Sequence, residues 1–210
     1  METEDALRGR ISADAFDPDR RIDAESIRDL IALACRSPST LNLQHWRFVL
    51  VVDRESISDL AALSTDNRRL ENAAAVVIVL GDLRAHEDLN EVLELNVEKG
   101  KLEPEQSKQW LEMASQIGSE PRRAREEAIR SSSMAAMALM LAATDRDLAS
   151  FSSSSVDADG VRERFSIPNR YLVTTLVALG HPAPGRPQHQ LVRRDLGQVL
   201  VEGGGEELQD

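Results

Sequence analysis

The sequence predicts an α+β fold in which helices cover both faces of a small sheet. Three short, uninterrupted apolar runs predict buried strands, at 48–53, 73–82 and 171–180. Segments with helical periodicity separate these runs, and no linker or internal repeat divides the chain. The 210 residues suffice for one domain with a sizeable core, so we expect a single domain over residues 1–210.

The helical segments follow in order. Residues 23–34 predict a helix capped by Asp23 and ended before Pro38, and 56–64 predict a second. Residues 84–118 form a charged helical segment broken by Pro104. A long helix is predicted at 123–145, with a second half that is apolar nearly all round, which favours the core or a subunit interface. A polar loop at 150–157, a short helix at 158–165 and a loose acidic tail from about 202 to 210 complete the chain.

Composition excludes several classes of function. A net charge of −11 argues against a nucleic-acid partner, which requires a basic surface. The sequence has neither an apolar stretch long enough to span a membrane nor an N-terminal apolar leader, so we expect a cytoplasmic protein without membrane contact. The single cysteine, Cys35, lies in an apolar helical pattern and is expected to be a small buried side chain.

Common catalytic motifs are absent. The sequence contains no G-x-G-x-x-G fingerprint, no P-loop and no G-x-S-x-G elbow. The four histidines lack the spacing of metal ligands, so no metal site is predicted. No set of residues suggests a self-contained catalytic triad.

Three polar clusters remain that folding alone does not explain. They are Arg10 with Ser12 before Phe16, the loop "SPSTLNLQHWRF" at 37–48, and Arg193 with Arg194. Guanidinium groups bind phosphate, and hydroxyls and amides bind a polyol or the edge of a ring, so the set suits a phosphorylated polar ligand. The alternative is a solvated arginine surface and an ordinary capping loop.

These features, in this order, resemble the FMN-dependent nitroreductase superfamily. The resemblance rests on "R-x-S" with Phe16 four residues after the serine, "SPSTLNLQHW" before a strand, the long apolar helix, "LVALGHP" and "RRDLGQVL". It implies a nitroreductase-like central mixed β-sheet flanked by helices, with the long central helix at a homodimer interface that holds two FMN molecules. Segment 84–118 is the variable part.

The resemblance also implies an activity. FMN would accept a hydride at N5 from NADH or NADPH and pass electrons to a nitroaromatic, a quinone or a similar small acceptor, by a ping-pong mechanism. The chemistry would belong to the flavin, so no catalytic side chain is implied. The alternative is a degenerate member that binds flavin or another ligand weakly and acts as a non-catalytic binding or regulatory protein.

Residue by residue, the resemblance implies a set of cofactor-binding positions. They are Arg10, Ile11, Ser12, Asp14, Pro38, Ser39, Thr40, Asn42, Asn67, Ser153, Ser154, Ser155, Arg193 and Arg194. The arginines would grip the phosphate, residues 38–42 would come from the other subunit, and Asn67 would face the pyrimidine edge.

Three departures from the family pattern affect the flavin site. Asp14 stands where the family usually has Arg or Lys, and a carboxylate there would disfavour the reduced, anionic flavin. Ile11 replaces a residue that is frequently basic. Serines 153–155 replace a Pro-x-(Glu or Gly)-Gly-Phe-Asp pattern that runs over the ring; the alternative for them is a flexible polar loop. Trp46 is expected to pack beneath the loop rather than to stack on a substrate.

Overall fold

The computed structural model describes residues 2–185 and 190–203, so the tail predicted at 202–210 lies largely outside the described residues. The strands are β1 (Trp46–Val51), β2 (Ala75–Asp82), β3 (Ala149–Ser153) and β4 (Tyr171–Gly180). The helices are α1 (Thr3–Gly9), α2 (Ala24–Ala34), α3 (Arg54–Ala62), α4 (Asn67–Leu70), α5 (Leu89–Glu98), α6 (Pro104–Ser119), α7 (Pro121–Asp145) and α8 (Ala158–Arg164). Short 3₁₀ turns lie at η1 (Thr40–Asn42), η2 (Ala85–Asp88) and η3 (Leu196–Gln198).

The four strands form one sheet in the order β1-β2-β4-β3, and neighbouring strands pair antiparallel. The mixed pairing expected from the sequence is limited, in the described chain, to an isolated parallel bridge between Ser12 and Ser150. β2 is buried along its whole length, as its apolar run predicts. β1 lies at an edge, so the middle of the strand is partly exposed, contrary to the expectation that both of its faces are buried.

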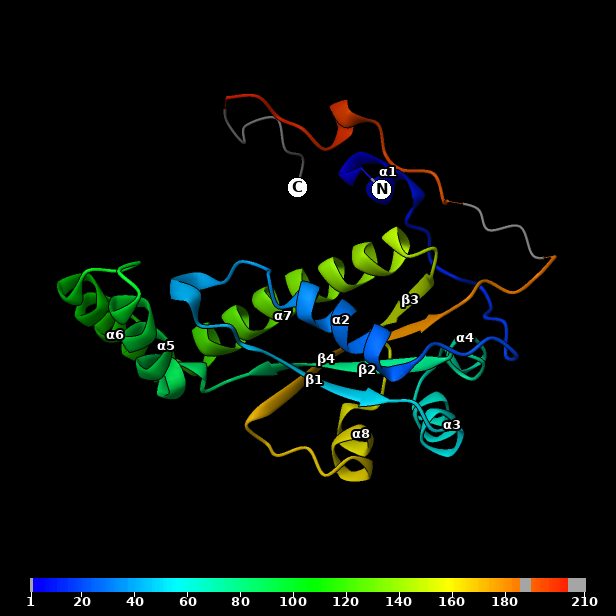
Figure 1. Ribbon diagram of the computed structural model, residues 1–210, viewed down its shortest axis with the longest axis horizontal. Coiled ribbons are helices and arrows are strands. Elements are labelled where there is room, and N and C mark those ends of the chain that lie inside the picture. The colour runs from blue at the N-terminus through cyan, green and yellow to red at the C-terminus, as the bar shows by residue number, and fades with distance from the viewer. Residues whose placement is uncertain (1, 186–189, 204–210) are drawn as a thin grey trace.

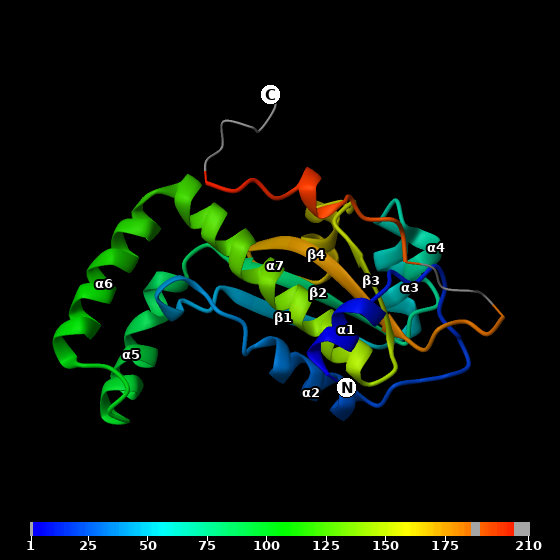
Figure 2. The same ribbon diagram turned by 90° about the horizontal axis from the view of Figure 1, so that it is seen from above.

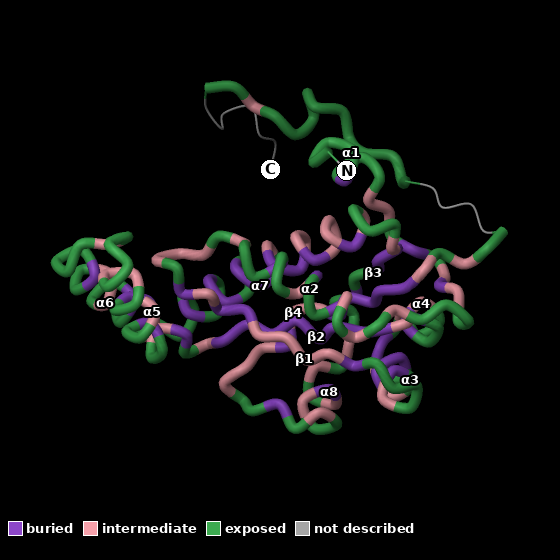
Figure 3. Tube along the Cα trace, in the orientation of Figure 1, coloured by how far each residue is buried: buried purple, intermediate pink, exposed green. Residues whose placement is uncertain are grey.

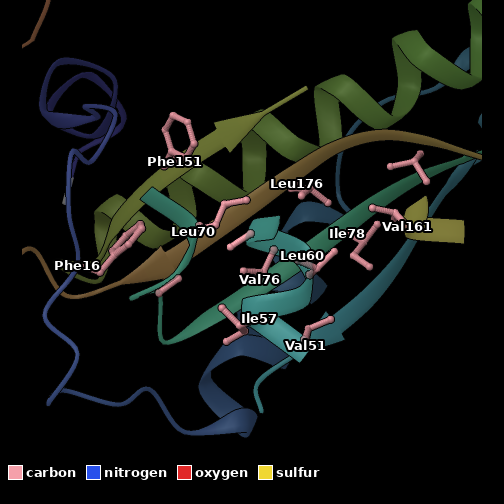
Figure 4. Close-up of a cluster of buried hydrophobic side chains, with 14 of the residues drawn as sticks. Phe16, Val51, Ile57, Leu60, Leu70, Val76, Ile78, Phe151, Val161 and Leu176 are labelled. Carbon is pink, nitrogen blue, oxygen red and sulfur yellow. The ribbon is translucent and has the colours of Figure 1, made fainter. Parts of the chain in front are cut away.

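Two apolar layers sandwich the sheet because side chains of a strand alternate between its faces. From β2, Val77 and Val79 join Leu139 of α7 and Leu30 of α2 on one face. Figure 1 shows α2 and α7 on that side and α3 and α8 on the other. On this opposite face Val76, Ile78 and Leu80 pack with α3, α8, Phe16 and Leu70, as the close-up in Figure 4 shows.

Helix termini follow local sequence chemistry. The Asp23 side chain accepts a hydrogen bond from the backbone N–H of Ser26 at 2.8 Å, which confirms it as the N-cap of α2. The long helix begins at Pro121, two residues before the predicted start, because proline suits the first turn of a helix. Cys35 follows the last buried residue of α2, Ala34, and is exposed, so the prediction of a buried thiol was wrong.

One strand was missed by the sequence reading. Residues 149–153 form the edge strand β3, although 150–153 were predicted to belong to the polar loop; Ala149 and Phe151 lie in the core and Ser152 is exposed. The segment 84–118 projects from the body as the α5–α6 pair, which Figure 2 shows clearly. Within the described ranges, no helix combines the length and apolarity needed to cross a bilayer.

Candidate functional site

A small cavity lies where the N-terminal segment crosses the edge of the sheet. Its volume is about 120 Å³, and its lining residues are Arg10, Ile11, Ser12, Asp14, Arg69, Gln190, Leu191 and Arg193. The backbone N–H of Ala13 donates to the carbonyl of Ser150 at 2.9 Å, and Phe16 is buried in the core, so residues 10–14 are held against β3. Four positions predicted at the N-terminus and one from the tail therefore share one cavity.

The charge of the cavity is mainly positive. Among the described residues, no carboxylate forms an ion pair with Arg10, and the only bond found for the Arg193 side chain is to the Leu191 carbonyl, at 2.9 Å. Asp14 is the one acidic side chain in the lining, and it pairs with Arg69 at 2.8 Å. Two guanidinium groups without a carboxylate partner and the Ser12 hydroxyl suit a phosphate group. Arg194 does not line this cavity.

The Asp14 carboxylate is paired with Arg69 rather than free. The Arg69 guanidinium binds this carboxylate and lies 4.9 Å from the centroid of the Phe151 ring, so two contacts fix it. The Asp14 carboxylate is thus paired with a guanidinium from α4. Arg69 was not predicted from the sequence, because nothing local distinguishes it from Arg68 and its partner Asp14 is 55 residues away.

The serine run is partly ordered by a hydroxyl–carboxylate cluster. Ser153, buried at the end of β3, donates to Asp66 at 2.7 Å, and its hydroxyl lies 3.2 Å from that of Ser64. Ser154 and Ser155 are exposed, and the Ser155 carbonyl accepts from the backbone N–H of Thr65 at 3.0 Å. Asn67 is exposed in a separate hollow against α3, so Asp66, rather than Asn67, is the polar residue beside the serine run.

The predicted loop 38–42 lies at the other end of the molecule from residues 10–14 (Figures 1 and 2). Pro38 and Asn42 are exposed, whereas the Thr40 hydroxyl donates inward to Glu127 of α7 at 2.7 Å. The Ser39 hydroxyl accepts from the backbone N–H of Gln44 at 2.9 Å. Within one chain, the structure does not bring this loop to the cavity.

Two buried ionisable groups lie behind the loop. Burial lowers the pKa of His45, although the nearby Glu127 and Asp82 carboxylates oppose the shift. Burial acts to raise the pKa of Glu127, but hydrogen bonds from Thr40 and Arg130 outweigh it, so the net shift is downward. His45 Nδ1 lies 3.1 Å from the Ser131 hydroxyl, and Trp46, the first residue of β1, is 4% exposed.

The lowered pKa of His45 predicts an acid-sensitive fold. The unfolded chain binds a proton near the ordinary pKa of about 6.5, whereas the folded chain resists it, so stability present above that pH is lost as the pH falls below it. Urea unfolding of wild type should show this decline between about pH 7 and 5. His181 shifts in the same direction, so the comparison is with His45→Asn, in which the decline should be smaller. An equal decline of stability with falling pH in wild type and in His45→Asn would contradict the prediction.

Comparison with known proteins gives concordant matches. The model of the nitroreductase family matches residues 7–181. YodC of Bacillus subtilis (strain 168) is 30% identical over 94% of this chain and 96% of its own length. The NADH dehydrogenase of Thermus thermophilus is 31% identical over 79% of this chain and 80% of its own. A protein of Exiguobacterium sibiricum, solved in complex with FMN, has the same fold, with a TM-score of 0.86, 23% identity and coverage of 96% of this chain and 97% of that one.

Proposed function

Because the chain belongs to the nitroreductase family, we propose that it is a flavin-dependent oxidoreductase that binds FMN and takes electrons from NADH or NADPH. The similarity to the NADH dehydrogenase of Thermus thermophilus supports a nicotinamide donor. The similarity in fold to a protein solved with FMN supports the choice of flavin.

The observation that carries the proposal is the cavity beside residues 10–14. The side chains of Arg10, Arg193 and Ser12 provide the donors that a phosphate needs, and the cavity lies in a chain whose net charge is −11. Arg69 also lines the cavity, where it is held by Asp14 and Phe151 and its charge is balanced by the Asp14 carboxylate. The donor set fits FMN, which when bound would supply the two-electron chemistry that the side chains alone do not offer.

A second copy of the chain would complete the site. A cavity of about 120 Å³ is small beside the roughly 300–1,000 Å³ of most cofactor sites, so the ring of a flavin needs another wall. The exposed loop at Pro38 and Asn42 lies at the opposite end of the same chain and can reach the cavity only from a partner. Apolar side chains on α7, such as Met137 and Leu141, remain partly exposed, which favours a homodimer through this helix.

Donor and acceptor would use the site in turn, so we expect a ping-pong mechanism with a nitroaromatic, a quinone or a similar small acceptor. The chain's own residues would then bind and orient rather than transfer protons. The alternative, a non-catalytic protein that binds flavin weakly, finds some support in Asp14, whose carboxylate offsets one of the cavity's positive charges.

The test is reconstitution with FMN followed by reduction. We expect protein that carries flavin absorbance, loses it on anaerobic addition of NADH or NADPH, and turns over nitroaromatics or quinones with parallel double-reciprocal lines. Protein that takes up no FMN would overturn the proposal. Protein that binds FMN without reduction by either nicotinamide would favour the non-catalytic alternative.

A further inference from the structure

The loop from Ser39 to His45 has an unusual backbone. Leu41, Asn42 and Gln44 have φ angles of 51°, 55° and 48°, in the left-handed region that residues other than glycine rarely adopt. The described chain has two other such residues, Asp147 and Ser166, and both are isolated. A left-handed residue with a side chain costs on the order of 1 kcal/mol. Such strain persists only where the surroundings impose it, so contacts must hold this loop.

Two polar side chains of α7 contact the loop. Glu127 accepts the hydrogen bond from Thr40 at 2.7 Å, and the Ser131 hydroxyl lies 3.1 Å from Nδ1 of His45. Residues 127 and 131 are one helical turn apart, so both belong to the same face of α7. The two contacts therefore fasten both ends of the strained stretch to one rigid element.

The apolar side chains of the loop contact a different element. Leu43, 5% exposed, belongs to the cluster that α5 and α6 build from Leu89, Leu93 and Ile117, and Leu41 packs against the same cluster. The loop is therefore held from two sides. Its leucines pack against α5 and α6, and Thr40 and His45 contact polar side chains of α7. Asn42, between the two leucines, is left exposed.

Glu127 is the residue of this arrangement whose burial is least favourable. It is 8% exposed, and a carboxylate taken out of water is unfavourable unless it is well paired. Arg130 pairs with one carboxylate oxygen and the Thr40 hydroxyl with the other. The Arg130 side chain is itself 56% exposed, so the Thr40 hydroxyl is the partner that reaches Glu127 from the loop side. This bond ties the buried carboxylate to the strained stretch of the loop.

We propose that Glu127 is a positioning residue, which through Thr40 holds loop 39–45 in the left-handed conformation that presents Asn42 to the flavin of a second chain. The proposal rests on the proposed function for the identity of the ligand, but the holding of the loop does not depend on it. Under this proposal Thr40 and Asn42 have different roles. Thr40 donates a hydrogen bond to Glu127 inside the molecule, whereas Asn42 is exposed.

The experiment compares Thr40→Val, Thr40→Ser and Glu127→Gln with wild type. Valine keeps the shape of threonine and removes the hydroxyl, whereas serine keeps the hydroxyl. Hydrogen–deuterium exchange of the FMN-free protein should be about tenfold faster at amides 39–45 in Thr40→Val and restored in Thr40→Ser. The dissociation constant of FMN should rise by a similar factor and recover in the same variant. Glu127→Gln weakens the contact that Thr40→Val removes, so the effects of the two substitutions on loop exchange should be non-additive when combined.

The matched control is Thr144→Val, which removes another hydroxyl bonded to α7, here to the Met140 carbonyl at 3.0 Å, far from the loop in sequence. Thr144→Val should change neither the exchange of amides 39–45 nor the dissociation constant of FMN. Unchanged loop exchange in Thr40→Val would overturn the proposal, and so would faster exchange with unchanged FMN affinity. If wild type itself binds no FMN, the proposed function fails, and the exchange data alone decide whether Glu127 holds the loop.

Discussion

Arg170→Met is expected to lower the free energy of unfolding by about 3 kcal/mol, which a urea titration would measure. Asp82, at the end of β2, is fully buried, and Arg170 binds it with two hydrogen bonds, of 2.7 and 2.8 Å. Removing the guanidinium leaves a buried carboxylate without its main partner, a change that typically costs about 3–5 kcal/mol. The lower end is expected because Arg47 stays 3.4 Å from the same carboxylate.

Arg164→Met is the control for this substitution. Arg164 also forms a short ion pair, 2.6 Å from Asp59, but each side chain is 42% exposed, so water solvates both charges when the pair is broken. Its unfolding curve should stay close to that of wild type. Equal losses in the two variants would mean that burial of Asp82 does not set the energy of the network.

Arg10→Gln is expected to weaken FMN binding by about 10- to 100-fold, the range of a charged hydrogen bond of about 1.5–3 kcal/mol. Arg10 lines the cavity together with Ser12, and among the described residues no carboxylate neutralises it, so its charge is available to a phosphate. Titration of the quenching of flavin fluorescence gives the dissociation constant. Raising the ionic strength should narrow the difference between wild type and variant, because part of the effect is charge attraction.

Arg20→Gln removes the same charge at a site that does not line this cavity, since Arg20 borders a separate groove with Arg54 and Ala74. It should leave FMN affinity within a factor of about 2 of wild type, because only long-range attraction is lost. A similar loss in both arginine variants would point to the overall charge of the chain rather than to the cavity.

The fold was predictable where one signal dominated. The run at 171–180 is β4 to the residue, and the run at 73–82 contains β2. β3 was missed because its three serines outweighed the alternation of Ala149 and Phe151, which a search for period 2 would have found. β1 begins at Trp46, two residues early, because Trp46 and Arg47 pair with Gly81 and Leu80, a long-range contact that no local pattern reveals.

The sequence grouped part of the candidate site but not the contacts that surround it. Arg10, Ser12 and Arg193, which motifs predict to bind one ligand, line one cavity, but the charge around them depends on contacts distant in sequence. The Asp14 carboxylate meets Arg69, 55 residues away, and Thr40 meets Glu127, 87 residues away. Propensities and spacing carry no information about such pairs, which only the packed sheet and helices determine.

The projecting α5–α6 pair affects how the protein unfolds on heating. This pair shares a small apolar cluster with Leu41 and Leu43 of loop 39–45, separate from the two clusters that hold the sheet. Figure 3 shows the buried stretches of chain within the pair. A unit so attached can melt before the rest, and the chain's two tryptophans lie one in each part, Trp110 in α6 and Trp46 in β1. If the pair melts first, the combined tryptophan fluorescence on heating sums two transitions, and a single fitted midpoint belongs to neither.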